Sequence, residues 1–255
     1  MNETAKVVAI IGNPISHSLS PKLHGYWIKK YKVNGFYIPV KINSHDLYDC
    51  INGMRKMGFC GANITIPYKE SIFKYVDDAS EVALTVGAIN TLLIKPSGKI
   101  IGTNTDVEGL LNNLKYTIPE WKKKTKKVLI IGAGGAARAA ATAFQQEKIK
   151  IKRIVNRTIE KSYIIKEQID EDIEPVKWDD INSVLKDTDL VINTTSLGMY
   201  GQPSLDIEIG EMEKNGIVYD IVYSPLETEL IKSAKQNKLQ HVDGLGMLIF
   251  QAVTG

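Results

Sequence analysis

The chain has 255 residues, which is enough for one large domain or two modest ones. Hydrophobic residues make up 44%, charged residues make up 24% and the net charge is only +3, so the composition is that of a soluble globular protein and gives no sign of a nucleic acid partner. No apolar stretch is long enough to span a membrane, and Cys50 and Cys60 lack metal-ligand spacing. We therefore expect a cytoplasmic protein with reduced thiols, no bound metal and no membrane partner.

The first hundred residues alternate between strand and helix signals. Strands are predicted at residues 7–11, 36–40 and 61–66, and a helix is predicted at residues 47–57. A further helix is predicted to start at Ser20, with this serine as the N-cap and Pro21 in the first turn. Alternation of this kind is typical of an α/β unit.

A hairpin is predicted around the turn sequence Lys95-Pro96-Ser97-Gly98. Its strands are residues 89–94 and 99–102. A turn centred on Pro96 and Ser97 pairs Asn90 near Thr103. Asn90, Asn104 and Asp106 are then expected to cluster at one end of the sheet.

Polar side chains gather where the predicted strands end. They are His17, Ser18, Ser20, Asn63, Thr65 and Lys69. In open α/β sheets, ligands bind at the carboxyl ends of the strands. Hydroxyls and amides with few charges suit a polyol, and a lysine can hold a carboxylate or donate a proton. The sequence therefore predicts a pocket for a small polyhydroxylated molecule.

A glycine-rich turn lies between a strand signal and a helix signal. Residues 132–137 read Gly-Ala-Gly-Gly-Ala-Ala, after the apolar run 128–131 and before the alanine-rich run 138–147. Gly132 permits a tight turn, Gly134 lets the backbone approach a pyrophosphate, and Ala137 allows close packing of helix on sheet. The free N–H groups of the helix N-terminus then favour phosphate. This context predicts a dinucleotide site, although a close-packed structural turn is the alternative.

The next predicted strand, residues 151–155, indicates which dinucleotide. It closes with Asn156-Arg157-Thr158, and Asn156 lies 24 residues after Gly132. NAD sites usually carry an acid near this position, where it binds the ribose 2′-hydroxyl. This chain has an arginine and no acid at that position, and the geometry of a guanidinium matches that of phosphate oxygens. We expect NADP(H) as the cofactor; a solvated loop arginine is the alternative.

Eight segments match, in order, the motifs of a known family. They are Gly12–Pro21, Gly61–Lys69, Gly87–Thr91, Gly102–Asp106, Gly132–Ala136, Asn156–Thr158, Tyr219–Pro225 and Asp243–Met247. With these motifs the chain resembles the shikimate dehydrogenase family along nearly its whole length. The chain ends four residues after Gln251, whereas family members usually continue through a longer terminal helix.

The resemblance implies NADP-linked interconversion of 3-dehydroshikimate and shikimate, a step of aromatic amino-acid biosynthesis. It also implies an α/β fold of two domains. Residues 1–106 plus 241–255 would form a substrate domain with a mostly parallel sheet, and residues 107–240 a Rossmann-type NADP-binding domain. The protein would be a monomer or a homodimer.

The resemblance also implies roles for individual residues. Ser18, Ser20 and Tyr223 would hold the substrate carboxylate, and Asn63, Thr65, Asn90 and Gln251 its ring hydroxyls. Lys69 and Asp106 would form the catalytic pair. At the cofactor it places Gly132, Ala133, Gly134, Gly135, Ala136, Asn156, Arg157, Thr158, Thr194, Ile221, Gly244 and Met247. A core role is the alternative for Tyr223 and Met247.

The chemistry makes a lysine–aspartate pair reasonable. When hydride adds to a ketone carbon, negative charge grows on the oxygen, and a nearby ammonium stabilises that charge and delivers a proton. Asp106 can orient Lys69 and bind a neighbouring hydroxyl. The alternatives are a solvated lysine at a helix start and an aspartate that only caps the helix near Val107.

Three functions remain open from the sequence: a shikimate dehydrogenase, a relative that also oxidises quinate, and a silent NADP-binding sensor. Quinate would favour a residue smaller than Ser18 or Ser20, and a sensor would lack Lys69 or Asp106, yet all four are present. For the dehydrogenase we expect hinges at residues 106–109 and 240–244, with Gly109 and Gly244 absorbing backbone rotation.

Overall fold

The computed structural model describes residues 4–255 and divides the chain into two compact units. The first unit is Met1–Thr105 with Ala252–Gly255, and the second is Asp106–Gln251. Residues 1–3 of the predicted first domain lie outside the described residues. Residues 241–251, which the sequence placed with the substrate domain, group with the second unit here. Their functional assignment stays a prediction.

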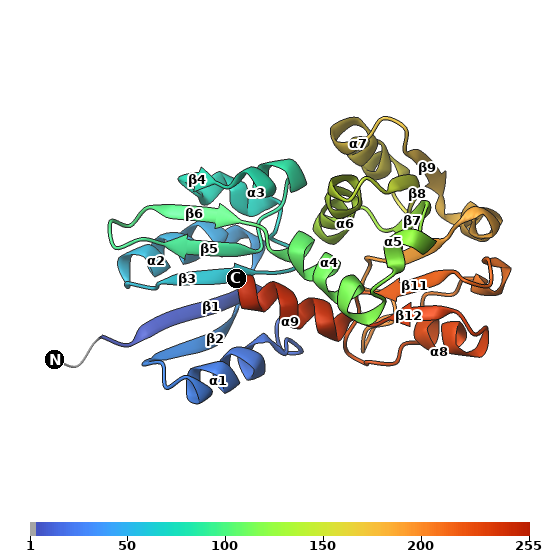
Figure 1. Ribbon diagram of the computed structural model, residues 1–255. Coiled ribbons are helices and arrows are strands. Elements are labelled where there is room, and N and C mark those ends of the chain that lie inside the picture. The colour runs from blue at the N-terminus through green and yellow to red at the C-terminus, as the bar shows by residue number, and fades with distance from the viewer. Residues whose placement is uncertain (1–3) are drawn as a thin grey trace. The chain divides into compact units, whose positions relative to one another are not determined.

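The first unit is built on a six-stranded mixed sheet with the order β2-β1-β3-β5-β6-β4 (Figure 1). The strands are β1 (Lys6–Gly12), β2 (Gly35–Lys41), β3 (Gly61–Ile64), β4 (Asp78–Ala79), β5 (Thr91–Ile94) and β6 (Ile100–Thr103). β1 pairs in parallel with β2 and β3, whereas β5 is antiparallel to both β3 and β6. The predicted third strand is two residues too long, since β3 ends at Ile64.

The predicted hairpin is confirmed. Thr91 pairs with Thr103, and the Asn90 N–H donates to the Thr103 carbonyl at 3.1 Å. The turn closes through hydrogen bonds between Lys95 and Lys99 and from the Gly98 N–H to the Lys95 carbonyl. The register places Asn90 at the edge of the sheet where β1 and β3 end.

Helices cover this sheet on its two faces. They are α1 (Ser20–Lys30), α2 (Leu47–Lys56) and α3 (Glu81–Val86), with 3-10 turns η1 (Ser44–Asp46) and η2 (Ser71–Tyr75). α1 packs on β2, where the His24 ring stacks on Tyr37. The other face buries a core that includes Ile11, Ile51 and Ile64.

The predicted cap of α1 is wrong. Leu19 occupies the N-cap position without a side-chain hydrogen bond, and Ser20 is the first helical residue. The Ser20 N–H donates to the Ser18 hydroxyl at 3.3 Å. Ser18 therefore provides the hydroxyl for an N–H at the start of the helix, and Ser20 is buried.

The second unit contains a six-stranded parallel sheet with the order β12-β11-β10-β7-β8-β9. The strands are β7 (Lys127–Ile131), β8 (Lys150–Asn156), β9 (Glu174–Lys177), β10 (Leu190–Asn193), β11 (Ile217–Asp220) and β12 (Gln240–Val242). Two halves run outward from the central pair β7 and β10. This is the doubly wound order of dinucleotide-binding folds.

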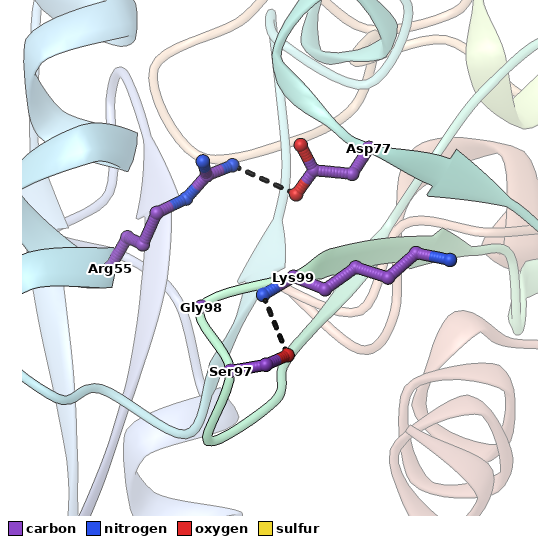
Figure 2. A pocket seen from close by; sticks show the side chains of 5 residues that line it. All are labelled: Arg55, Asp77, Ser97, Gly98 and Lys99. Atoms are coloured by element: carbon purple, nitrogen blue, oxygen red, sulfur yellow. Dashed lines mark hydrogen bonds and ion pairs between the residues drawn. The ribbon is translucent and has the colours of Figure 1, made fainter.

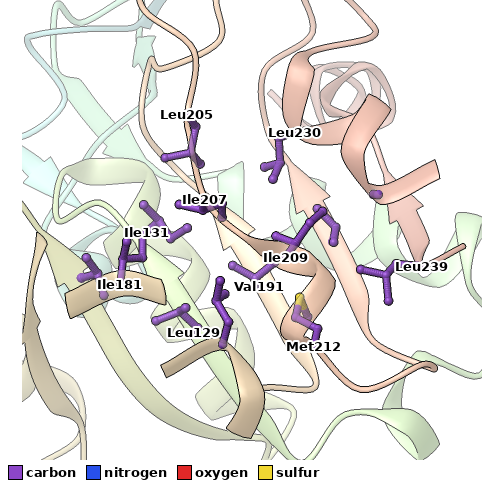
Figure 3. Packing of buried hydrophobic residues seen from close by; sticks show 14 of the residues in the cluster. Leu129, Ile131, Ile181, Val191, Leu205, Ile207, Ile209, Met212, Leu230 and Leu239 are labelled. Atoms are coloured by element: carbon purple, nitrogen blue, oxygen red, sulfur yellow. The ribbon is translucent and has the colours of Figure 1, made fainter. Parts of the chain in front are cut away.

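The helices of the second unit complete the fold. They are α4 (Asp106–Thr117), α5 (Trp121–Lys124), α6 (Gly135–Gln146), α7 (Ile159–Ile169), α8 (Glu229–Gln236) and most of α9 (Gly244–Thr254), with η3 (Trp178–Asp187) and η4 (Ile209–Glu211). The last residues of α9, from Ala252 on, group with the first unit. Figure 3 shows the core on one face of the sheet, where Val191 lies near Ile209 in a cluster that also includes Leu129 and Leu230. The neighbouring residues Val128 and Ile130 are also fully buried, so both faces of β7 are covered.

Two glycines that we expected to act as hinges are sites of close packing. A Cβ at Gly109 would lie 2.6 Å from Cβ of Gln251, and a Cβ at Gly244 would collide with the Ile221 carbonyl. Gly246 packs in the same way against Asn113. The small size of Gly109 and Gly246 lets α4 and α9 approach closely, and that of Gly244 lets α9 begin against the Ile221 carbonyl. Close packing therefore explains these glycines without any backbone rotation.

Candidate active site

The loops that follow β1 and β3 are tied together at the carboxyl ends of these strands. The Asn13 N–H donates to the Ile66 carbonyl at 2.9 Å, and the Thr65 N–H donates to the Ile11 carbonyl at 2.9 Å. A Cβ at Gly12 would collide with the Thr65 side chain. These contacts hold the segment leading to Ser18 beside the segment leading to Lys69.

Two amides predicted to bind substrate lie in one hydrogen-bond network. Asn63 is 8% exposed on β3, and Asn90 is 3% exposed just before β5. Thr91 connects them, since its hydroxyl accepts from Nδ2 of Asn63 at 3.0 Å and donates to Oδ1 of Asn90 at 3.0 Å. The Tyr37 hydroxyl adds a hydrogen bond of 2.7 Å to Oδ1 of Asn63. The sequence did not reveal Tyr37, because a tyrosine in an alternating strand is ordinary.

The predicted catalytic residues belong to different units. Lys69 is half-buried in the first unit, and its carbonyl accepts from the Ile89 N–H at 2.7 Å, next to Asn90. Asp106 is the first residue of α4 in the second unit and is 4% exposed. A helix N-terminus stabilises a carboxylate by its N–H groups and partial positive charge.

Two further residues predicted to bind substrate lie in the second unit. Tyr223 follows β11 and is half-buried. Gln251 lies on α9, where its Nε2 donates to the Leu248 carbonyl at 3.0 Å and its Cβ faces Gly109.

The glycine turn has the geometry that the motif predicts. Gly132 adopts a φ of +110°, and its N–H donates to the Val155 carbonyl of β8 at 2.8 Å. A Cβ on Gly132 would lie 2.6 Å from the Thr194 hydroxyl, which itself donates to the Ile131 carbonyl at 2.6 Å. Gly132 and Thr194, both predicted at the cofactor, therefore meet at the ends of β7 and β10.

The start of α6 forms an open cradle. Gly134 is the N-cap with an extended backbone, it is exposed, and no heavy atom lies within 4 Å of a Cβ built on it. Ala133 is buried, whereas Gly135 and Ala136 are half-buried. The N–H groups of this turn head a helix of 12 residues. Open space in front of a helix N-terminus fits the pyrophosphate of a dinucleotide.

The end of β8 lies next to the glycine turn. Val155, which binds Gly132, is followed by Asn156, whose Nδ2 donates to the Thr158 carbonyl at 2.8 Å. Arg157 is exposed at the tip of this turn. A guanidinium beside the turn, with no acid in the ribose position, fits a 2′-phosphate.

Three other predicted cofactor residues lie near the junction of β11 and α9. The Ile221 N–H donates to the Asn193 carbonyl at 3.2 Å, and Gly244 packs directly against the Ile221 carbonyl. Met247 is 8% exposed one turn along α9. Its burial agrees with the core alternative as well as with a place beside the cofactor.

The buried carboxylate of Asp220 supports these loops, and the sequence did not predict this role. Oδ1 of Asp220 accepts from Nδ2 of Asn193 at 3.0 Å and from the Val222 N–H at 3.1 Å, and Oδ2 accepts from the Thr228 hydroxyl at 2.6 Å. Burial, together with a smaller contribution from the nearby Asp243, raises the pKa of Asp220 to about 6 despite these hydrogen bonds. An aspartate at the end of a strand gives no sequence signal of such burial.

One open pocket lies away from the predicted residues. Figure 2 shows Arg55 pointing toward Asp77, at 2.9 Å, beside the turn of Ser97, Gly98 and Lys99. It lies at the start of β6, opposite the edge where β1 and β3 end. Within residues 4–255, no group of three or more His, Cys, Asp or Glu side chains is placed to hold a metal ion.

A doubly wound parallel sheet, with a glycine turn and an arginine at neighbouring strand ends, defines a dinucleotide-binding protein of the α/β class. Comparisons with known proteins give the family. The family model described as shikimate dehydrogenase substrate binding domain matches residues 10–92, and that described as shikimate / quinate 5-dehydrogenase matches residues 115–246. The chain belongs to the shikimate dehydrogenase family.

Individual relatives cover nearly the whole chain. Shikimate dehydrogenase (NADP(+)) of Azorhizobium caulinodans is 40% identical over 250 residues, which are 98% of this chain and 89% of the relative. A solved shikimate dehydrogenase in complex with NADP+ is 35% identical, with a TM-score of 0.88 over 98% of this chain and 88% of its own. Quinate dehydrogenase of Corynebacterium glutamicum in complex with NAD is 28% identical, with a TM-score of 0.89 over 98% of this chain and 92% of its own. Of the helices in residues 4–255, none combines the length and apolar character needed to cross a bilayer.

Proposed function

We propose that this protein is an NADP-dependent shikimate dehydrogenase, which reversibly reduces 3-dehydroshikimate to shikimate in aromatic amino-acid biosynthesis. The observation that carries the proposal is the turn after β8, where Arg157 lies beside the glycine turn of a chain from this family. The family membership supports the reaction, and the arginine without an acid supports NADP.

The cofactor would be held by the glycine turn, the start of α6 and Arg157. N–H groups at the α6 start would bind the pyrophosphate, and the guanidinium would bind the 2′-phosphate. Thr194, Ile221, Gly244 and Met247 would line the rest of the site, and Asn156 and Thr158 would shape the turn around the arginine. When bound, NADPH supplies the hydride.

Lys69 would protonate the substrate oxygen during reduction. Its ammonium would stabilise the negative charge that develops there and then deliver a proton. Asp106 would orient the lysine and accept a hydrogen bond from a substrate hydroxyl. In the reverse direction Lys69 would take the proton from the hydroxyl being oxidised.

The remaining predicted residues would hold the substrate in place. Ser18, Ser20 and Tyr223 would bind its carboxylate, and Asn63, Thr65, Asn90 and Gln251 its ring hydroxyls. The amide network around Thr91 supports the assignment of Asn63 and Asn90, because both amides are already held in fixed positions. Precise placement of reacting groups is a large part of enzymatic rate enhancement.

Quinate is the second candidate substrate, since a solved quinate dehydrogenase has a similar fold. That protein is described with NAD, whereas this chain carries Arg157 and no acid after β8. Ser18 and Ser20 are both retained, which favours shikimate over the bulkier quinate. We also propose a cytoplasmic enzyme, a monomer or a homodimer, with no nucleic acid partner.

The test is product identification. The protein is incubated with 3-dehydroshikimate and NADPH, and the product is identified by chromatography against a shikimate standard. Shikimate formed in step with NADPH loss is expected. Recovery of unchanged 3-dehydroshikimate would overturn the proposal.

A further inference from the structure

A chain of hydrogen bonds crosses the first sheet on the face that α1 covers. The Tyr37 hydroxyl donates to Asn63 Oδ1 at 2.7 Å, and Asn63 Nδ2 donates to the Thr91 hydroxyl at 3.0 Å. The Thr91 hydroxyl donates to Asn90 Oδ1 at 3.0 Å, and Asn90 Nδ2 donates to the Thr105 hydroxyl at 2.9 Å. All five side chains belong to the first unit.

Two backbone groups determine the direction of every bond in this chain. The Thr105 N–H can only donate, so the atom of Asn90 that lies 3.0 Å away must be Oδ1. The Asn90 carbonyl can only accept, so the atom of Asn63 that faces it at 3.4 Å must be Nδ2. Asn63 therefore turns Oδ1 toward Tyr37, and the tyrosine hydroxyl must donate.

The orientation of Asn90 has a consequence for its ligand. Its Oδ1 already accepts from the Thr91 hydroxyl and the Thr105 N–H, which occupy both lone pairs. A substrate hydroxyl that donates to Oδ1 would therefore have to compete with these two partners. The network in this way disfavours a substrate hydroxyl that donates to Asn90.

Tyr37 is held firmly although it lies on the edge strand. β2 is separated from β3 by β1, and Tyr37 reaches diagonally across Ile10 to Asn63. Its ring stacks on His24, with centroids 4.1 Å apart and planes 5° from parallel. Burial lowers the pKa of His24 to about 4, so the stacked imidazole is neutral at pH 7.

We propose that Tyr37 and Thr91 are positioning residues that fix the orientation of the Asn63 and Asn90 amides toward the ring hydroxyls of the substrate. This inference rests on the proposed function, because the two amides must bind substrate. Without the Tyr37 hydroxyl, Asn63 loses a partner that distinguishes its oxygen from its nitrogen. Without the Thr91 hydroxyl, both amides lose a partner.

The experiment measures kcat/KM for shikimate with NADP in variants of the full chain. Tyr37→Phe removes the hydroxyl and keeps the stacked ring, and Thr91→Val removes the hydroxyl at constant shape. Thr91→Ser restores a hydroxyl. The double variant Tyr37→Phe/Asn63→Ala tests whether Tyr37 acts through Asn63. Tyr48→Phe, at an exposed tyrosine on α2, is the matched control.

The inference predicts a loss of about 5–20-fold for Tyr37→Phe and about 10–100-fold for Thr91→Val, since each removes one or two hydrogen bonds that hold a ligand amide. Thr91→Ser should stay within about 2-fold of the unaltered protein, because hydroxyl donation is retained. In the Asn63→Ala background, Tyr37→Phe should lower kcat/KM by less than about 2-fold. The Kd for NADP should be the same in all variants.

Two results for Tyr37→Phe would overturn the inference. One is an unchanged kcat/KM for Tyr37→Phe, and the other is an equal loss with and without Asn63, which would mean that Tyr37 acts elsewhere. Failure of the unaltered protein to form NADPH from shikimate would overturn the proposed function, and this inference with it. Equal losses for Thr91→Val and Thr91→Ser would also contradict it.

Discussion

The Thr228 hydroxyl donates a hydrogen bond of 2.6 Å to Oδ2 of Asp220 and accepts one of 3.3 Å from the Ile231 N–H. Thr228 is the N-cap of α8, so the end of β11 is connected directly to the start of this helix. Through Oδ1, Asp220 also holds Asn193 and the Val222 N–H. One carboxylate therefore joins the ends of β10 and β11 to α8.

Asp220 makes the stability of the protein depend on pH. Its pKa in the folded protein is about 6, above the ordinary value of 3.8, so the folded state binds the proton more tightly than the unfolded state does. Above pH 6 the ionised carboxylate therefore lowers the free energy of unfolding by about 3 kcal/mol. This destabilisation disappears as the pH falls toward 4 and the carboxylate is protonated. Asp220→Asn keeps an acceptor for Asn193 and Val222 without the charge.

We expect the free energy of unfolding of Asp220→Asn, relative to that of the unaltered protein, to be higher at pH 8 than at pH 4.5 by about 2–3 kcal/mol. Urea unfolding of both proteins at the two pH values measures the difference. A difference in stability that is the same at both pH values would contradict the assignment of this titration to Asp220.

Lys69→Ala should lower turnover by about 10²–10⁴-fold, the range of a positioned acid–base group, while shikimate binding weakens much less. Steady-state kinetics with a binding titration separates the two effects. Lys74→Ala, at an exposed lysine of η2, is the control and should keep full turnover. A Lys69→Ala variant with more than about a third of normal turnover would remove the lysine from the mechanism.

Arg157→Ala should weaken NADP binding by about 10–100-fold and leave NAD binding nearly unchanged, because only the 2′-phosphate contacts the guanidinium. Fluorescence titration with both cofactors measures this, with Lys161→Ala at an exposed site on α7 as the control. The double variant Asn156→Asp/Arg157→Ala should shift preference toward NAD. Equal losses for the two cofactors would show that Arg157 acts through folding.

Gly246→Ala should destabilise the protein by about 1–3 kcal/mol, because the new Cβ would collide with Oδ1 of Asn113. Asn113 donates to the Tyr219 hydroxyl and to the Asp243 carbonyl, so it has no room to retreat. Gly25→Ala, on an exposed part of α1 with nothing near its Cβ, should raise stability by about 0.5–1 kcal/mol. Equal thermal midpoints for the two variants would contradict this packing argument.

Local signals account for the parts of the fold that the sequence predicted. The glycine turn, the hairpin around Pro96 and the strand ahead of Gly132 each depend on residues adjacent in the chain. The register that sets Asn90 beside Thr103 follows from turn geometry alone. The parallel doubly wound order follows from alternating strands and helices.

Contacts between distant residues explain what the sequence did not predict. Tyr37 reaches Asn63 because the strand order β2-β1-β3 places the two residues one strand apart. No single segment of the sequence determines this order. The burial of Asp220 likewise depends on α8 and β10. The cap of α1 was misassigned because Ser18 and Ser20 are both suitable hydroxyls, and only the backbone geometry distinguishes them.

The central claim, NADP-linked oxidation of shikimate, is tested most directly by absorbance at the NADPH band. The unaltered protein is mixed with shikimate or quinate, each with NADP or NAD, and the four initial rates are compared. The account predicts the fastest rate with shikimate and NADP, with kcat/KM at least about 10-fold above shikimate with NAD. A faster rate with quinate, an equal rate with NAD, or no reduced cofactor from shikimate would contradict it.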